Sequence, residues 1–200
     1  MPIDTIIFDL GGVLIDWDPR YLYRTIFRTE EEIDRFLSGV CTPAWNAEQD
    51  RGRSLREATE DLAAVHPEFA NEIRAYYGRW HEMLGGPIHE TVELLQSLKQ
   101  GEQYRLLALT NWSAETFPIA RNRFDFLDWF EGVVVSGEEK LIKPDPKLYR
   151  VLLDRYQVEP SRAVFLDDAE KNVVAARELG MQGIVVRSPM QLREDLADLL

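Results

Sequence analysis

The chain has 200 residues, 45% of them hydrophobic, which suits one folded core or a core with an insert. Its formal net charge of −12 argues against nucleic acid and anionic membrane as partners, because proteins that bind them usually present basic surfaces. The single cysteine, Cys41, excludes an internal disulfide and fits a reducing compartment. The sequence contains neither a signal-peptide pattern nor 18 consecutive apolar residues, so we expect a cytoplasmic protein.

The first predicted element is a buried strand at residues 6–8, and three residues of chemical interest follow it. Asp9 ends the apolar run, and Gly11 and Gly12 come directly after. Ligand sites form at the carboxyl ends of parallel strands, and paired glycines let a ligand approach the main chain. Asp9 is therefore a candidate functional carboxylate, with a turn aspartate that satisfies its own loop as the alternative.

Residues 17–86 lack any convincing strand and carry several signals of helix starts. Asp18 with Pro19 is typical of an N-cap followed by N1, and the acids after Thr29 suit a first helical turn. Ser54 and Glu57 match a capping box, and Pro67 is expected to open a further helix. The segment 85–87, Gly-Gly-Pro, is predicted to be a hinge back to the main domain.

From residue 88 onward, predicted strands and helices alternate. The strands are expected at 104–109, 132–136, 163–166 and 183–186, and the helices at 88–99, 114–127, 145–156, 170–179 and 189–199. Such alternation predicts a doubly wound, Rossmann-like α/β fold with a parallel five-stranded sheet. The predicted domains are an α/β core, residues 1–16 and 87–200, and a helical cap, residues 17–86, inserted after the first strand.

Polar residues end three of the five predicted strands: Asp9, Thr110 with Asn111, and Asp167 with Asp168. The ends of parallel strands share one rim of the sheet, so these residues are expected to share a pocket. Clustered carboxylates there suit Mg²⁺, and the sequence holds no His/Cys cluster for zinc.

Lys143 is a further candidate, because Pro144 disfavours helix at this position and leaves the lysine free to face an anion. Asp9 itself could attack phosphorus as a nucleophile. Taken singly, the acids and polar residues could instead cap helices, and Lys143 could be a surface lysine.

Four segments together resemble the haloacid dehalogenase (HAD) superfamily: FDLGGVL, LTNWS, KPDPKLY and VFLDDAEKNVVAARELGM, in the family's order. The likeness covers the whole chain and is greatest to the sugar-phosphatase branch, which includes α-glucose-1-phosphatase-like proteins. It implies a Mg²⁺-dependent phosphatase of a small phosphorylated metabolite, with an aspartyl-phosphate intermediate.

The resemblance also implies a role for each motif residue. Asp9 matches the nucleophile and a metal ligand, and Gly11 matches the residue whose carbonyl binds the metal. Thr110 and Asn111 match the phosphate-binding motif, to which the backbone at Gly11 and Gly12 would add, and Lys143 matches the catalytic lysine. Asp167 and Asp168 match the acidic pair at the metal, with Asp168 favoured as the direct ligand.

Position 11 departs from the family pattern, because most phosphatases of this superfamily have an aspartate there as general acid and base. Glycine cannot transfer a proton, so alkyl phosphates are predicted to turn over slowly unless a metal-bound water, the cap or Asp16 substitutes. In the cap, Trp45, Arg51 and His81 are candidates to line the pocket, with packing inside the cap as the alternative for Trp45 and His81.

Two alternative functions stay open at this point: a metal-independent 2-haloacid dehalogenase, and a non-catalytic binding protein of the same fold. The retained acidic pair argues for metal and against the dehalogenase. We expect a monomer or a small homo-oligomer.

Overall fold

The computed structural model describes residues 2–200 and contains the predicted parallel sheet. Its strand order is β5-β4-β1-β6-β7, so β1 occupies the centre. All five strands are short and mostly buried: β1 (Thr5–Phe8), β4 (Arg105–Thr110), β5 (Gly132–Val135), β6 (Ala163–Asp167) and β7 (Gln182–Val185). After β1 the chain builds one side of the sheet and then crosses to the other, which makes the end of β1 the topological switch point.

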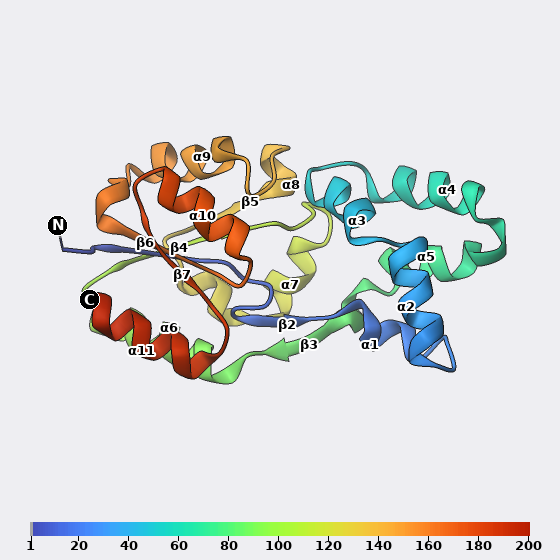
Figure 1. The fold of residues 1–200 in the computed structure, drawn as a ribbon, viewed down its shortest axis with the longest axis horizontal. Helices are drawn as coiled ribbons and strands as arrows, with labels where there is room; N and C mark the ends of the chain where they lie inside the picture. The colour runs from blue at the N-terminus through green and yellow to red at the C-terminus, as the bar shows by residue number, and fades with distance from the viewer. Residues whose placement is uncertain (1) are drawn as a thin grey trace.

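Helices cover both faces of the sheet, as a doubly wound fold requires (Figure 1). The helices of this part are α6 (His89–Gly101), α7 (Phe117–Arg123), α8 (Ser136–Glu139), α9 (Pro146–Tyr156), α10 (Glu170–Glu178) and α11 (Pro189–Leu199). Alternate residues of β1 point to opposite faces: Ile6 and Phe8 belong to the larger apolar cluster, and Ile7 belongs to the cluster beneath α9 and α10. Each strand therefore contributes side chains to two cores, which explains its continuous apolar run.

Five helices between residues 19 and 78 form a separate lobe on the right of Figure 1, here called the helical lobe. They are α1 (Pro19–Tyr23), α2 (Glu30–Gly39), α3 (Pro43–Asp50), α4 (Leu55–Val65) and α5 (Ala70–Gly78). The predicted cap at Asp18 is present, since its carboxylate accepts a bond from the Arg20 amide. Thr29 and Glu32 form a complete capping box with both of its hydrogen bonds. At the start of α4, the Ser54 side chain accepts from the Glu57 amide, which is one of the two bonds of such a box.

Two antiparallel strands join the helical lobe to the core and correct the prediction of a strand-free segment with a loop hinge. They are β2 (Ile15–Trp17) and β3 (Leu84–Pro87). Strands this short, one of them Gly-Gly-Pro, carry no alternating apolar pattern, so the sequence indicated a turn instead.

Two predicted helices are divided into shorter elements in the structure, and some elements were not predicted. The helix expected to run from Pro67 to the hinge is a 3₁₀ turn (Pro67–Phe69), α5 and a second 3₁₀ turn (Trp80–Met83). The helix expected at 114–127 is α7 followed by a 3₁₀ turn (Asp125–Trp129), and another such turn (Pro160–Arg162) precedes β6. Helices α3 and α8 were not predicted, although Thr42 before Pro43 is a readable start signal for α3.

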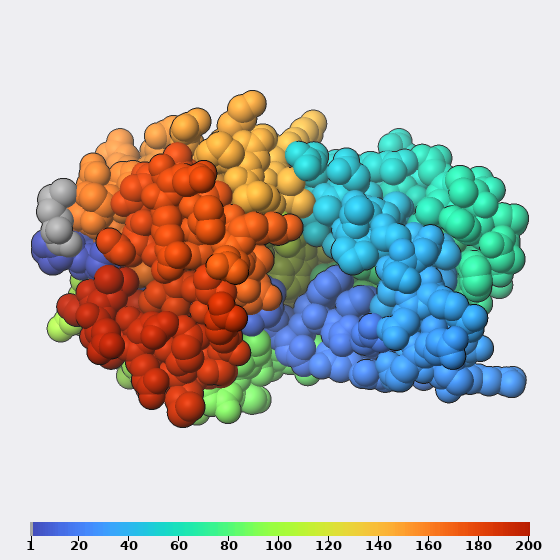
Figure 2. Space-filling view, in the orientation of Figure 1, coloured from blue at the N-terminus to red at the C-terminus, as the bar shows by residue number. Residues whose placement is uncertain are grey.

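No helix among residues 2–200 is both long enough and apolar enough to span a membrane. In the space-filling view, the helical lobe lies beside the core, and its α3 end touches the segment that follows β5 (Figure 2).

Candidate active site

Strand register brings the predicted acidic residues together at the switch point. Phe8 pairs with Leu166 in the parallel ladder, so the next residues along, Asp9 and Asp167, lie side by side. Asp9, Asp167 and Asp168 each offer a carboxylate oxygen within 4.8 Å of the other two. Asp9 and Asp167 are buried, whereas Asp168 is exposed. The chain thus concentrates three carboxylates in one small volume, which requires positive charge nearby.

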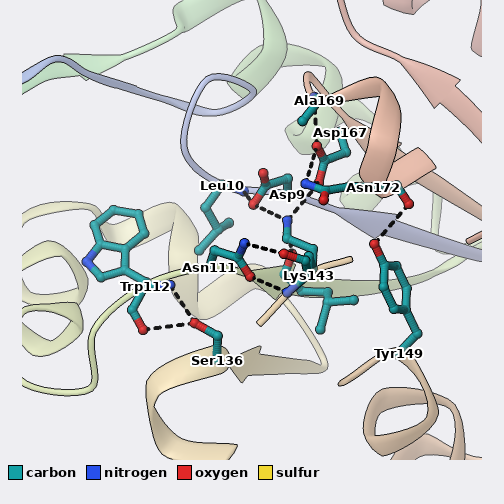
Figure 3. A network of polar contacts seen from close by, with 11 residues as sticks. Asp9, Leu10, Asn111, Trp112, Ser136, Lys143, Tyr149, Asp167, Ala169 and Asn172 are labelled. Carbon is teal, nitrogen blue, oxygen red and sulfur yellow. Dashed lines mark hydrogen bonds and ion pairs between the residues drawn. The ribbon is translucent and has the colours of Figure 1, made fainter. Parts of the chain in front are cut away.

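Lys143 supplies positive charge from inside the protein, where it is only 2% exposed (Figure 3). Its Nζ donates to Asp167 Oδ2 at 2.7 Å and to the Leu109 carbonyl at 2.9 Å, and it forms an ion pair with Asp9 Oδ1 at 2.9 Å. Three oxygen atoms therefore surround the ammonium group. Burial alone would lower the pKa of Lys143, but the two carboxylates outweigh it and raise the pKa, so the lysine stays charged.

Two side-chain amides hold the lysine and its partner in place. Asn111 forms two hydrogen bonds with the backbone of Lys143. Its Oδ1 accepts from the Lys143 N–H at 2.8 Å, and its Nδ2 donates to the Lys143 carbonyl at 3.2 Å. Asn172 donates to both oxygens of Asp167 at 3.0 Å, and the Ala169 amide donates to Oδ1 at 2.8 Å. Both oxygens of Asp167 are therefore occupied by protein donors.

Asp9 is the most electrostatically unusual carboxyl of the cluster. Burial, with the charge of Lys143 lowering the pKa and that of Asp167 raising it, brings the pKa of Asp9 up to about 7. The Leu10 amide donates to Asp9 Oδ1 at 2.7 Å and also favours the ionised form. Burial, reinforced by Asp167, also raises the pKa of Asp168. A cation at these oxygens would relieve the repulsion that the fold builds in.

Gly12 is required by the same cluster. Its φ of +73° favours glycine, and a Cβ there would lie 2.5 Å from Asp168 Oδ2. The Gly12 amide donates to the Ile15 carbonyl at 2.9 Å, which commits that amide to its own loop rather than to the predicted phosphate contact. A Cβ on Gly11 would meet nothing within 4 Å, so the space above position 11 is open.

That space belongs to a cavity of about 80 Å³ between the strand ends and the helical lobe. The core lines it with Gly11, Asn111 and Trp112, and the lobe lines it with Asn46, Asp50 and Tyr77. Trp17 and Trp80 add two further aromatic rings. The cavity lining therefore combines polar side chains from both the core and the lobe with four aromatic rings.

The three residues expected to line the pocket from the cap lie elsewhere. Trp45 packs against Tyr76 and Tyr77, behind the cavity wall. Arg51 and His81 are exposed and take no part in the lining. Their positions on helices could not be assigned from sequence, because α3 and the 3₁₀ turn before β3 were not predicted.

The sequence comparisons identify the family. A model of the haloacid dehalogenase-like hydrolases matches residues 3–180. The chain belongs to this family. Its predicted α/β fold, its recognition as a HAD-like protein and its assignment as a hydrolase are thereby confirmed.

Named relatives and a solved structure agree with this assignment. A sesquiterpene phosphatase of Aspergillus oryzae is 28% identical over 179 residues, 89% of this chain and 87% of that protein. A phosphorylated carbohydrates phosphatase of Thermotoga maritima is 26% identical over 191 residues, 91% of this chain and 84% of that protein. A HAD family enzyme of Bacteroides thetaiotaomicron, solved with magnesium and inorganic phosphate, has a TM-score of 0.71 at 23% identity, covering 92% and 94% of the two chains, and so shares the fold.

Several residues around this HAD-like site were missed from sequence. Asn172 lies inside the quoted DDAEKN motif, five residues after Asp167, yet only the helical turn of α10 explains how it reaches that carboxylate. Ser136 Oγ accepts a hydrogen bond from the Trp112 amide, and the two residues meet only because β4 and β5 are neighbours in the sheet. Asp50 carried no signal beyond its place at the end of α3.

The alternative proton donor Asp16 is occupied elsewhere. It lies on β2, where Tyr21 Oη donates to its Oδ2 at 2.6 Å, and it is not among the residues that line the cavity. Cys41 is buried, and burial raises the pKa of its thiol to about 12, which makes it unreactive.

Proposed function

We propose that this HAD-like hydrolase is a Mg²⁺-dependent phosphatase of a small phosphorylated metabolite, with a sugar phosphate as the first candidate. The observation that carries the proposal is the buried Lys143 held between Asp9 and Asp167, with Asp168 beside them at the switch point. The two relatives named as phosphatases support the reaction class, although their named substrates differ in polarity.

Asp9 would be the nucleophile and would form an aspartyl-phosphate intermediate. A nucleophilic carboxylate must be ionised, and burial works against this by raising the pKa of Asp9. Lys143 counteracts burial through its 2.9 Å ion pair with Asp9 Oδ1. Lys143 would therefore keep Asp9 ionised and also neutralise an approaching phosphate, because two like charges would otherwise meet in a desolvated site.

The donor set fits Mg²⁺, which prefers a few hard oxygen ligands. Asp9, the Gly11 carbonyl and Asp168 would hold the ion, and Asp168 can approach only because residue 12 has no Cβ. When bound, Mg²⁺ supplies charge neutralisation to the carboxylates and the phosphate. Asp167 would act through Lys143 instead of as a direct ligand, because its oxygens already accept from Lys143, Asn172 and the Ala169 amide.

Phosphate recognition would come from the ends of β1 and β4. Thr110 is the last residue of β4 and is 1% exposed, and Gly11 borders the cavity. We propose that Thr110 and the Gly11 backbone bind the phosphate group. Asn111 would chiefly position Lys143, because its side chain forms two hydrogen bonds with the Lys143 backbone. Residues 17–86 would serve as a cap that excludes water above this site and selects the substrate.

The test is hydrolysis of p-nitrophenyl phosphate and of a panel of sugar phosphates, with Mg²⁺ and with EDTA. We expect turnover with Mg²⁺ only, and its loss in Asp9→Asn. Asp168→Asn should weaken Mg²⁺ binding by calorimetry without unfolding the protein, whereas the exposed control Asp198→Asn should not. Unchanged Mg²⁺ affinity in Asp168→Asn would refute the metal assignment.

The same assay separates the rival functions. A 2-haloacid dehalogenase would release halide from a 2-haloacid without Mg²⁺ and leave phosphates intact. A non-catalytic protein would bind Mg²⁺ and inorganic phosphate and turn over neither substrate.

A further inference from the structure

The proposed phosphatase reaction leaves one chemical task without a residue: proton transfer to the leaving oxygen. Position 11 is glycine, and the Lys143 ammonium group is engaged with Asp9, Asp167 and the Leu109 carbonyl. Among the residues that line the cavity above Gly11, one carries a carboxyl group, and it is Asp50. Asp50 comes from the helical lobe and lines this cavity together with Gly11 and Asn111, which the core contributes.

A chain of hydrogen bonds fixes the carboxyl group of Asp50. Asn46, one turn earlier on α3, donates its Nδ2 to Asp50 Oδ2 at 2.9 Å. Tyr77 on α5 in turn donates its hydroxyl to Asn46 Oδ1 at 2.9 Å. All three residues line the cavity, so this series of hydrogen bonds forms the polar part of its wall on the lobe side.

The backbone of Asp50 is also tied to the core. Ser136 Oγ donates to the Asp50 carbonyl at 2.5 Å and accepts from the Trp112 amide at 2.8 Å. Two residues later, a Cβ on Gly52 would lie 2.8 Å from the Gly137 carbonyl, so the two backbones touch. Asp50 thus sits at the contact between lobe and core, in a fixed position relative to the strand ends that carry Asp9.

The surroundings of Asp50 favour its protonated form. Burial raises the pKa of Asp50 to about 7, against a smaller lowering by a hydrogen bond from the Ser113 backbone. The titratable groups facing it are the hydroxyls of Tyr76 and Tyr77 on α5, whose pKa values burial also raises. No lysine or arginine forms an ion pair with Asp50 among residues 2–200. A carboxyl group that exchanges its proton near neutral pH suits acid–base work.

We propose that Asp50 is the general acid and base of this site, replacing the side chain that Gly11 lacks. This assignment rests on the proposed phosphatase function. As Asp9 attacks phosphorus, the bond to the ester oxygen breaks and Asp50 gives that oxygen its proton. A water then attacks the phosphoryl group on Asp9 and loses a proton to Asp50. The alcohol and inorganic phosphate leave, and both carboxyl groups return to their starting forms.

The experiment compares wild type with Asp50→Asn on esters of different leaving-group quality at saturating Mg²⁺. For an alkyl phosphate, which needs protonation to leave, we expect kcat/KM to fall by about 10²–10³-fold. For p-nitrophenyl phosphate, whose leaving group needs no proton, kcat/KM should stay within about fivefold of the wild-type value. Its kcat and KM should fall together, because the later attack of water on the phosphoryl group still needs the base. The retained activity also shows that the variant is folded.

Gly11→Asp supplies a rescue, because a side chain at position 11 enters open space. In the Asp50→Asn background, it should restore alkyl phosphate turnover at least tenfold. The matched control is Glu48→Gln, at an exposed position of the same helix, which should change neither substrate's kinetics.

The outcomes distinguish the two proposals. If wild type hydrolyses no phosphate ester, the phosphatase proposal fails and Asp50 loses its role with it. If wild type is active but Asp50→Asn lowers kcat/KM equally for both esters, or leaves the alkyl ester unaffected, only the Asp50 assignment is wrong. A rise in KM confined to hydroxyl-rich substrates would also refute it and make Asp50 a substrate-binding residue.

Discussion

Replacing Lys143 with methionine tests the electrostatic design of the site directly. Methionine keeps the apolar stem of the side chain and removes the ammonium group, which bonds Asp9, Asp167 and the Leu109 carbonyl. The lysine is 2% exposed, so water cannot take its place freely. Removing one partner of a buried ion pair costs about 3–5 kcal/mol, because an uncompensated charge stays behind. For a chain of this size, that lowers the melting temperature by roughly 6–20 °C.

The loss should depend on pH with a definite sign. Lys143 lowers the pKa of Asp9, so its removal raises the pKa of Asp9 above the value of about 7 in the wild type. Below that pKa the carboxyl group is neutral and needs no partner; above it the charge is buried alone. The deficit in unfolding free energy should therefore be larger at pH 8.5 than at pH 5.5.

The measurement is urea unfolding at both pH values in EDTA, so that metal binding does not contribute. Asp9→Asn added to Lys143→Met should recover part of the loss at pH 8.5, since it removes the unpaired charge. The exposed Lys147→Met serves as control and should stay within about 0.5 kcal/mol of wild type. A deficit below about 1 kcal/mol at pH 8.5, or one that does not vary with pH, would refute the reasoning.

Two other predictions follow from the same geometry. Gly12→Ala should weaken Mg²⁺ binding at least tenfold by calorimetry, because its Cβ would displace Asp168. The control Gly11→Ala should leave the affinity within about twofold, since a Cβ there meets nothing. Equal effects of the two variants would contradict the steric argument. Folded Asp50 keeps its proton between about pH 4 and 7, where the unfolded chain has lost it, so wild type loses stability as pH rises through that window. Asp50→Asn should therefore gain roughly 2–4 kcal/mol relative to wild type between pH 4 and 8 in urea unfolding, and a constant difference would show that burial does not perturb the group.

The layout of the core could be predicted from sequence because its signals are local. Each buried strand is a continuous apolar run, and Asp145 with Pro146 marks a helix start that the structure contains. Parallel strands also end at a common rim, so Asp9 and Asp167 could be placed together without knowing a single contact. The family motifs then gave each residue an expected role.

Other features needed the tertiary structure, because they depend on segments far apart in the chain. Nothing near Asn111 in the sequence indicates that its side chain would bond the backbone of Lys143, and nothing near Ser136 indicates that it would bond the Trp112 amide. The strands β2 and β3 pair across 67 residues and are too short to leave a periodic pattern. Local propensity cannot encode such pairings, since each half is stable only when the other is present.

Asp50 shows the same limit at the level of function. In the sequence it is one acid among 35, and its neighbours give it no special pattern. Folding brings α3 against the ends of β4 and β5, and that packing leaves Asp50 half-buried in the lining of the cavity that Gly11 also borders. Desolvation then raises its pKa, and desolvation is a property of the assembled molecule. The sequence alone thus determined the α/β core and the motif residues around Asp9, whereas only the tertiary structure decided which acid lines the cavity beside Gly11.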